Sequence, residues 1–180
     1  SCMNTLENVA RQIRKDVVTM IYESGDGHPS PALSIADILA VLYFHVLNID
    51  PQNPKKPDRD RFILSKGHAC TALYAALARR GFFPVSALST FRSLHSILQG
   101  HPYQNKTPGL DSTTGSLGHG ISIGLGMALA CRIQGYQNYI YVIIGDGEQE
   151  EGLIWEAAMA AVKYRAGRLI VFADCNGLQS

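Results

Sequence analysis

The chain has 180 residues, 46% of them hydrophobic, which is enough to bury one good core and predicts a single α/β domain. Its formal net charge of +1 gives no indication of nucleic-acid binding or of attraction to an anionic membrane surface. No apolar run reaches the roughly 20 residues that a membrane-spanning helix needs, so we expect no membrane association.

The N-terminal part of the chain predicts two helices. Apolar residues recur at i, i+3 and i+4 over residues 5–23, which is the spacing of an amphipathic helix. The turn Gly25-Asp-Gly-His-Pro29 interrupts this pattern. Ser34 and Asp37 have capping-box spacing and predict a second, buried helix over residues 34–47.

A strand and two further helices are predicted in the middle of the chain. The proline-rich and charged stretch 50–60 indicates a surface loop. Arg61-Phe-Ile-Leu64 then predicts a short strand that leads directly into Ser65-Lys-Gly-His68. A helix follows and ends at Gly81, and residues 86–94 predict another short helix.

The next part of the chain predicts an irregular loop over residues 100–114 and a helix over residues 115–134. This helix is rich in glycine and alanine. Such small side chains permit close packing of backbones, either on the sheet or on another helix.

A β-α-β unit is the most informative feature of the sequence. Two β-rich apolar runs begin at Tyr139 and Leu169, and each ends in a polar turn. The stretch between them predicts a crossover helix over residues 153–164 that ends at Gly167. The two strands are therefore expected to be parallel and to end at the same edge of the sheet.

Asp146 and Asn176 follow these strands and are 30 positions apart in the sequence. We expect them to lie side by side at the edge where open α/β sheets bind ligands. A carboxylate, an amide oxygen and turn carbonyls are hard oxygen donors of the kind that Mg²⁺ accepts, with phosphates and water completing its octahedron. The pattern predicts a cradle for a metal-bound diphosphate.

The turn Gly145-Asp-Gly-Glu148 also has a purely structural interpretation. Asp146 could cap the following helix, and the glutamates of residues 148–151 would then complement the helix dipole. Acidic residues near a diphosphate would repel it, so the functional interpretation requires a cation. Asn176 supplies that cation with a second ligand, which favours function.

Four histidines each follow a glycine, namely His28, His68, His101 and His119. Any one of them could be an ordinary core or surface histidine. Together they favour a polar pocket in which imidazoles bind hydroxyls or phosphates and move protons. Their spacing does not fit a zinc motif such as His-Glu-x-x-His.

The segment Thr113-Thr-Gly-Ser-Leu-Gly-His-Gly120 is rich in glycine and opens a predicted helix. No Gly-Lys-Ser/Thr follows, so it is not a P-loop, and no clear strand precedes it, which is against a dinucleotide fingerprint. As a glycine-rich helix start it is a candidate anion contact.

The cysteines Cys2, Cys70, Cys131 and Cys175 show no Cys-x-x-Cys spacing. This predicts reduced thiols in a cytoplasmic protein. For Cys175, which lies in the turn that carries Asn176, a space-filling role is favoured over a redox role.

Several of these motifs resemble those of the transketolase family. Gly145-Asp-Gly-Glu148 followed by Asn176 resembles the thiamine diphosphate motif. Similarity to transketolase in particular lies in Gly27-His-Pro29, Arg61-Phe-Ile-Leu-Ser-Lys-Gly-His68, Thr114-Gly-Ser-Leu-Gly118 and residues 146–158. The resemblance implies that residues 1–180 are the diphosphate-binding domain: a parallel sheet flanked by helices, incomplete at its C-terminus and without the pyrimidine-binding domain.

The resemblance also implies how a cofactor and a metal would be held. Asp146 and Asn176 would bind Mg²⁺ (or Ca²⁺) through their side chains, and Leu178 would bind it through its carbonyl. The residues that would contact thiamine diphosphate are His68, Gly115, Ser116, Leu117, Gly147, Glu148 and Asn176.

Catalytic roles follow from the same resemblance. His28, His101 and His68 would be the catalytic histidines, and the first two would line the channel for the sugar. Glu151 resembles a position that links the two cofactor sites of a dimer.

The implied function is transfer of a two-carbon ketol unit from a ketose or ketose phosphate to an aldose or aldose phosphate. The resemblance is to the N-terminal subunit of a split transketolase, completed by a separate C-terminal subunit that carries the pyrimidine-binding domain. We expect a homodimer or a heterotetramer. The alternatives are another thiamine enzyme, such as deoxyxylulose-phosphate synthase or a 2-oxo-acid dehydrogenase, and a non-catalytic regulatory subunit. Two departures from the usual family pattern, at Ser30-Pro-Ala32 and at His119, leave the sugars unspecified.

Overall fold

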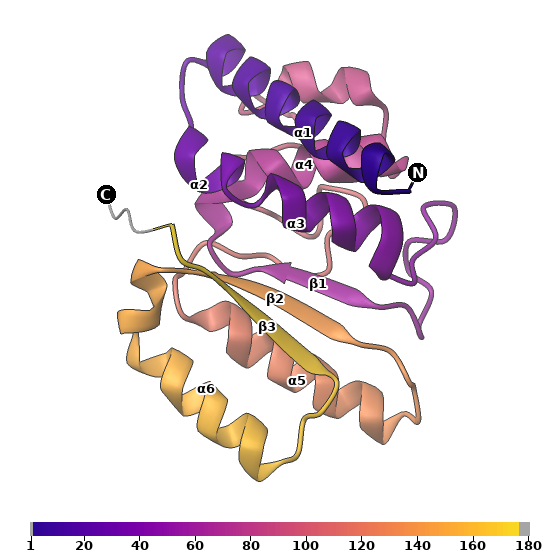
Figure 1. The fold of residues 1–180 in the computed structure, drawn as a ribbon, viewed down its shortest axis with the longest axis vertical. Coiled ribbons are helices and arrows are strands. Elements are labelled where there is room, and N and C mark those ends of the chain that lie inside the picture. The colour runs from indigo at the N-terminus through magenta and orange to yellow at the C-terminus, as the bar shows by residue number, and fades with distance from the viewer. Residues whose placement is uncertain (1, 177–180) are drawn as a thin grey trace.

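A computed structural model of the chain describes residues 2–176, with side chains from Thr5 onward. Its centre is a sheet of three parallel strands in the order β1-β2-β3 (Figure 1). The strands are β1 (Arg61–Leu64), β2 (Ile140–Gly145) and β3 (Leu169–Asp174).

Helices cover both faces of this sheet (Figure 1). One face carries α1 (Cys2–Ser24), α2 (Pro29–Leu33), α3 (Ala36–Val41) and α4 (Cys70–Arg80), and the other carries α5 (His119–Ile133) and α6 (Gly152–Lys163). Shorter helical segments are the π-helix Leu42–Val46 and the 3-10 helices Gly67–Ala69, Val85–Thr90 and Gly147–Glu150. No helix among the described residues is both long and apolar enough to cross a membrane.

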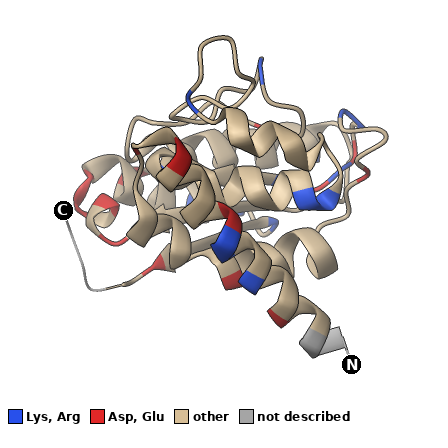
Figure 2. Ribbon diagram, turned by 90° about the horizontal axis from the view of Figure 1, so that it is seen from above, with Lys and Arg blue, Asp and Glu red and all other residues tan. Residues whose placement is uncertain are grey.

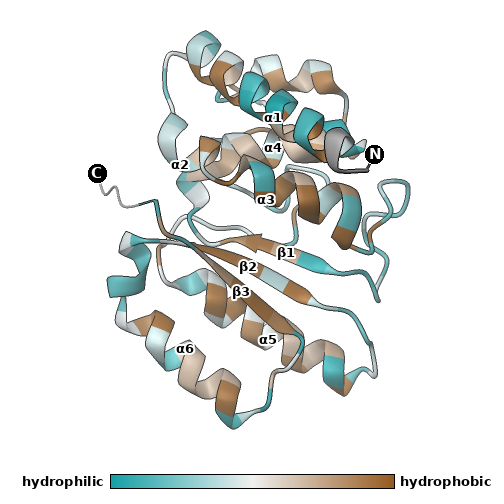
Figure 3. Ribbon diagram, in the orientation of Figure 1, coloured by the Kyte–Doolittle hydropathy of each residue, from teal (hydrophilic) through white to brown (hydrophobic). Residues whose placement is uncertain are grey.

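Alternating side chains of the strands enter two hydrophobic clusters, one on each face of the sheet. The cluster beneath α1, α3 and α4 includes Phe62, Leu64, Tyr141 and Ile143. The cluster beneath α5 and α6 includes Ile63, Ile140, Val142 and Ile144. Because β1 and β2 are covered on both faces, they are apolar along almost their whole length, as Figure 3 shows. The predicted α/β class with a parallel sheet is confirmed.

The predicted helix over residues 34–47 is confirmed as α3 and the π-helix Leu42–Val46 that follows it directly, but the predicted capping box at its start is wrong. Helix α2 ends at Leu33, and α3 begins two residues after Ser34 with Ile35 at its N-cap position and no side-chain cap. The Ser34 hydroxyl bonds the Pro31 carbonyl instead, and Asp37 pairs with Arg14 of α1. A local bond of Ser34 and a tertiary ion pair of Asp37 therefore replace the expected capping box.

Other predicted helix ends shift for local reasons. Helix α5 starts at His119 and not at Gly115, because Gly118 adopts a left-handed conformation with φ of 87°. Helix α6 ends at Lys163, and Arg165, with φ of 52°, takes the left-handed position that was expected of Gly167. The short helix expected over residues 86–94 is the 3-10 segment Val85–Thr90.

Candidate functional site

The largest pocket that we describe, of about 570 Å³, lies at the carboxyl ends of the three strands. This is the edge at which open α/β sheets bind ligands, and the volume suits a cofactor. Its walls come from the turn before α2 and from the segments that follow β1, β2 and β3. Lining residues predicted from the sequence are His28, His68, Leu117, Asp146, Gly147, Glu148 and Asn176.

Asp146 and Asn176 reach this pocket from neighbouring strands. Gly145 of β2 pairs with Asp174 of β3, so the two predicted ligands follow paired positions in a parallel register. The expected juxtaposition of the two strand ends is confirmed, and both residues line the same pocket. The Asp146 carboxylate makes no capping hydrogen bond to the following turn, so the capping role in the purely structural interpretation is wrong. Leu178 lies outside the described residues.

The donor set suits a cation that needs few protein ligands. Within residues 2–176, no three His, Cys, Asp or Glu side chains gather into a metal-binding group. Mg²⁺ commonly uses one or two carboxylates and completes its octahedron with phosphate oxygens and water. The carboxylate of Asp146 and the amide oxygen of Asn176 fit that requirement.

Three of the glycine-flanked histidines gather beside the pocket. The rings of His28 and His68 meet edge to face, with centroids 5.3 Å apart. The His101 ring lies against Gly115, since a Cβ atom on that glycine would be 3.3 Å from His101 Cδ2. Exposed His119 is not among the residues that line the pocket, and its Nδ1 lies 3.3 Å from the Leu117 carbonyl oxygen.

Half-buried His68 has a pKa below its usual 6.5. Burial is the main cause, and the nearby His28, Lys66 and His101 lower the pKa further, whereas Glu148 opposes them. Its imidazole is therefore neutral at pH 7, with one ring nitrogen able to donate and the other to accept.

Glu148 differs from the other acidic residues of its turn because it is only 3% exposed. Its Oε2 accepts hydrogen bonds from Ser65 Oγ at 2.6 Å and from the Gly118 N–H at 2.8 Å. Its Oε1 accepts one from the Gly145 N–H at 3.0 Å. Both oxygens of this carboxylate thus have hydrogen-bond donors inside the protein, although acidic residues do gather near the C-terminal end of the described chain (Figure 2).

The glycine-rich helix start was a candidate anion contact, but the amides of Gly118 and Gly120 already have acceptors within the protein. Glu148 takes the Gly118 N–H, and Ser65 Oγ takes the Gly120 N–H at 3.2 Å. Leu117 lines the pocket, whereas Gly115 and Ser116 are exposed residues outside its lining. The N-cap residue of α5 thus donates to the protein's own carboxylate, and Gly120 in its first turn donates to a protein hydroxyl.

Lys66 and Asp174 are pocket residues that sequence reasoning missed. Lys66 is 2% exposed, and its Nζ lies 2.5 Å from Asp174 Oδ2 and 3.0 Å from the Pro31 carbonyl oxygen. This pair ties β3 to the segment after β1. A lysine directly after an apolar strand was a usable signal, but its partner is 108 positions away.

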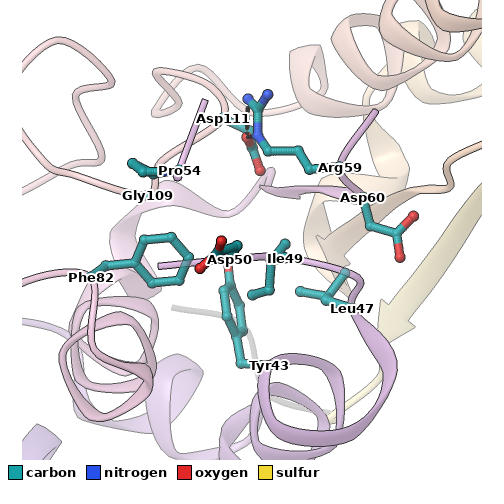
Figure 4. A pocket seen from close by; sticks show the side chains of 10 residues that line it. All are labelled: Tyr43, Leu47, Ile49, Asp50, Pro54, Arg59, Asp60, Phe82, Gly109 and Asp111. Carbon is teal, nitrogen blue, oxygen red and sulfur yellow. Dashed lines mark hydrogen bonds and ion pairs between the residues drawn. The ribbon is translucent and has the colours of Figure 1, made fainter. Parts of the chain in front are cut away.

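A second cavity lies near the start of β1 and is unsuited to a cofactor. Its volume is about 10 Å³, which is room for about one water molecule. Figure 4 shows Arg59 and Asp111 at its wall, where the guanidinium donates to the carboxylate at 2.7 Å. The Phe62 N–H also donates to Asp111, so this group fastens β1 in place.

Comparison with known proteins agrees with the geometry. Residues 5–179 match the family described as "Transketolase, thiamine diphosphate binding domain". The chain is 49% identical, over 97% of its length, to the 6-deoxy-6-sulfo-D-fructose transketolase subunit SqwG of a Clostridium species, and spans 63% of that subunit. It is 42% identical, over 98% of its length, to an apulose-4-phosphate transketolase subunit of Phocaeicola vulgatus, again spanning 63% of it.

Solved structures give the same result. The transketolase of Campylobacter jejuni superposes with a TM-score of 0.91 at 33% identity, covering 97% of this chain and 28% of that one. A Pichia stipitis transketolase in complex with sedoheptulose 7-phosphate superposes with a TM-score of 0.91 at 35% identity, covering 97% and 27%.

Proposed function

The chain belongs to the family of transketolase thiamine diphosphate-binding domains, and from this membership we propose that it acts as the N-terminal subunit of a split transketolase. In this proposal it transfers a two-carbon ketol unit from a ketose to an aldose. The chain spans 63% of the length of the two subunits described above, so the activity of the whole protein is part of the proposal.

The observation that carries the proposal is the pocket shared by Asp146 and Asn176 at the ends of adjacent parallel strands. A diphosphate there needs a cation, because carboxylates would otherwise repel it. We propose that these two side chains hold Mg²⁺ (or Ca²⁺), with the Leu178 carbonyl as a third ligand. His68, Gly115, Ser116, Leu117, Gly147, Glu148 and Asn176 are the proposed cofactor contacts.

When bound, thiamine diphosphate supplies the nucleophilic carbon and the electron sink that cleavage beside a ketone requires. The residues of this chain would bind, orient and exchange protons. His28, at the exposed end of the histidine pair, is suited to meet a sugar hydroxyl. Neutral His68 can donate or accept a proton. His101 lies against Gly115 of the glycine-rich segment Thr113–Gly120.

A partner subunit would supply the part of the active site that this chain does not contain. We propose that a separate C-terminal subunit carries the pyrimidine-binding domain, in a homodimer or heterotetramer of complete sites. Glu151 is the residue proposed to link two such sites.

The substrate class follows from the named relatives. One is named for 6-deoxy-6-sulfo-D-fructose and the other for apulose 4-phosphate, both of which are ketoses with an anionic end. We propose a ketose phosphate or sulfonate as donor for this chain.

A titration of thiamine diphosphate into the chain with its partner subunit, with and without Mg²⁺, tests the proposal. Metal-dependent uptake followed by ketol transfer to an aldose phosphate is the expected result. Metal-dependent uptake without transfer to any aldose would favour a different thiamine enzyme. Absence of uptake would favour a regulatory subunit that only keeps the fold.

A further inference from the structure

We propose that Glu148 is a positioning residue whose buried carboxylate clamps together the three loops that form the floor of the cofactor pocket. The inference rests on the proposed function for its link to the cofactor, and on the hydrogen bonds of Glu148 for the clamp itself. It gives Glu148 a positioning role in addition to the proposed contact with thiamine diphosphate.

Two of the three partners of Glu148 lie far from it in the sequence, and the third belongs to its own turn. Ser65 begins the segment after β1, Gly118 ends the glycine-rich loop, and Gly145 is the last residue of β2. These loops carry His68, Leu117 and Asp146 respectively, all of which line the pocket. One side chain therefore fixes the relative positions of three sets of pocket residues.

Geometry leaves this clamp little freedom. Gly118 has a left-handed φ of 87°, and a Cβ there would lie 3.1 Å from Glu151 Cβ. A Cβ on Gly120 would lie 2.4 Å from Ser65 Cβ, so α5 starts in direct contact with the loop after β1. Both glycine N–H groups are buried and need acceptors, which are Glu148 Oε2 and Ser65 Oγ.

Charge favours the same arrangement. Helix α5 has no N-cap side chain of its own and no acidic residue in its first turn. The Glu148 carboxylate, which comes from a different segment of the chain, places its oxygen at this helix N-terminus, where an acidic side chain is favoured. An uncharged amide at this position would turn an N–H towards donors that need an acceptor, leaving buried groups unpaired.

The test compares Glu148→Gln with Glu150→Gln, which changes an exposed glutamate two positions away in the same turn. The first readout is amide hydrogen exchange of the cofactor-free chain with its partner. The second readout is the dissociation constant of thiamine diphosphate in the presence of Mg²⁺. Ser65→Ala removes one arm of the clamp and serves if Glu148→Gln fails to fold.

Two further variants separate positioning from general stability. Glu148→Asp keeps the charge and is expected to recover part of the affinity. Ile13→Val removes a buried methyl group from α1, away from the pocket. Its amide exchange and cofactor affinity are measured at a temperature at which its loss of stability equals that of Glu148→Gln.

We expect Glu148→Gln to speed exchange in residues 113–121 and 145–151 and to weaken cofactor binding about tenfold or more. Ser65→Ala should act in the same direction with a smaller effect. Glu150→Gln and Ile13→Val should neither speed exchange in these segments nor weaken cofactor binding. Unchanged exchange in both loops, or an equal loss of affinity in Ile13→Val, would overturn the clamp. Faster loop exchange in Glu148→Gln, together with a wild-type protein that takes up no thiamine diphosphate, would support the clamp and contradict the proposed function.

Discussion

Asp146 lies where β2 ends and the pocket begins, and it is the residue on which metal binding depends most. Asp146→Ala removes the only carboxylate of the proposed metal site, so cofactor retention should be lost. The free energy of unfolding should change by less than about 1 kcal/mol, because the side chain is partly exposed and caps nothing. Cofactor content after gel filtration and thermal denaturation measure the two effects. Global unfolding of the variant would restore the structural interpretation of the turn.

His28 tests the division between cofactor binding and chemistry. His28→Ala should leave the thiamine diphosphate dissociation constant unchanged, since the residue lines the pocket but is not among the proposed cofactor contacts. Ketol transfer should fall about 100-fold or more, which is typical when an acid–base group is lost. A parallel loss of cofactor affinity and turnover would show that His28 holds the cofactor. His95→Ala, outside the pocket lining, is the matched control.

His68 predicts how stability responds to acid. Its pKa in the folded protein lies below the unfolded value of about 6.5, so the unfolded chain takes up a proton first as the pH falls. Well above pH 6.5, His68 therefore has no effect on the pH dependence of the free energy of unfolding. As the pH drops through 6.5 towards the lower pKa of the folded protein, the free energy of unfolding decreases. Melting temperatures of the cofactor-free protein from about pH 8 to about pH 5 measure this. The wild type should lose more than His68→Asn over that range, and identical slopes would contradict the prediction.

Among the structural elements, α5 packs on the sheet through glycine, and two of its glycines allow a matched test. A Cβ on Gly124 would lie 2.7 Å from Val142 Cγ2 of the central strand, whereas a Cβ on Gly126 would meet nothing within 4 Å. Gly124→Ala should cost about 1–3 kcal/mol of unfolding free energy through overpacking. Gly126→Ala should gain up to about 1 kcal/mol through helix propensity. Urea denaturation of both variants measures the difference, and equal stabilities would mean that α5 lies farther from β2.

Strands were more predictable from the sequence than helix ends. The apolar run of β2 is buried on both faces and cannot be mistaken for a loop, and its parallel pairing with β3 follows from the helix between them. Helix α6 ends at Lys163 and is followed by Arg165 in the left-handed conformation. Propensity rules instead favour Gly167, two residues later, for that conformation. Local patterns therefore predicted the elements but not all of their boundaries.

The candidate site was predictable to the extent that it depends on strand ends. Asp146 and Asn176 each follow an apolar run, so topology alone brings them together. The clamp at Glu148 and the Lys66–Asp174 pair require knowledge of which loops meet, and their partners lie 83 and 108 positions apart. The local sequence can single out Lys66, but it does not indicate which distant residue such a group contacts.

For the whole molecule, the fold matches the transketolases over nearly the entire chain, but only over part of each of them. The proposed site supplies ligands for a metal and contacts for a diphosphate. In the proposed enzyme, a second subunit must cover the exposed side of the pocket to make it catalytic.

The central claim is that Asp146 and Asn176 jointly hold a divalent cation that binds the diphosphate. A crystal structure of the chain with its partner subunit, grown with thiamine diphosphate and Mn²⁺, tests it through the anomalous scattering of the metal. Our account predicts one metal peak with an Asp146 carboxylate oxygen and the Asn176 amide oxygen each about 2.1 Å away, and with diphosphate oxygens in its octahedron. A metal bound elsewhere, or side chains of Asp146 and Asn176 that point away from a common centre, would contradict it.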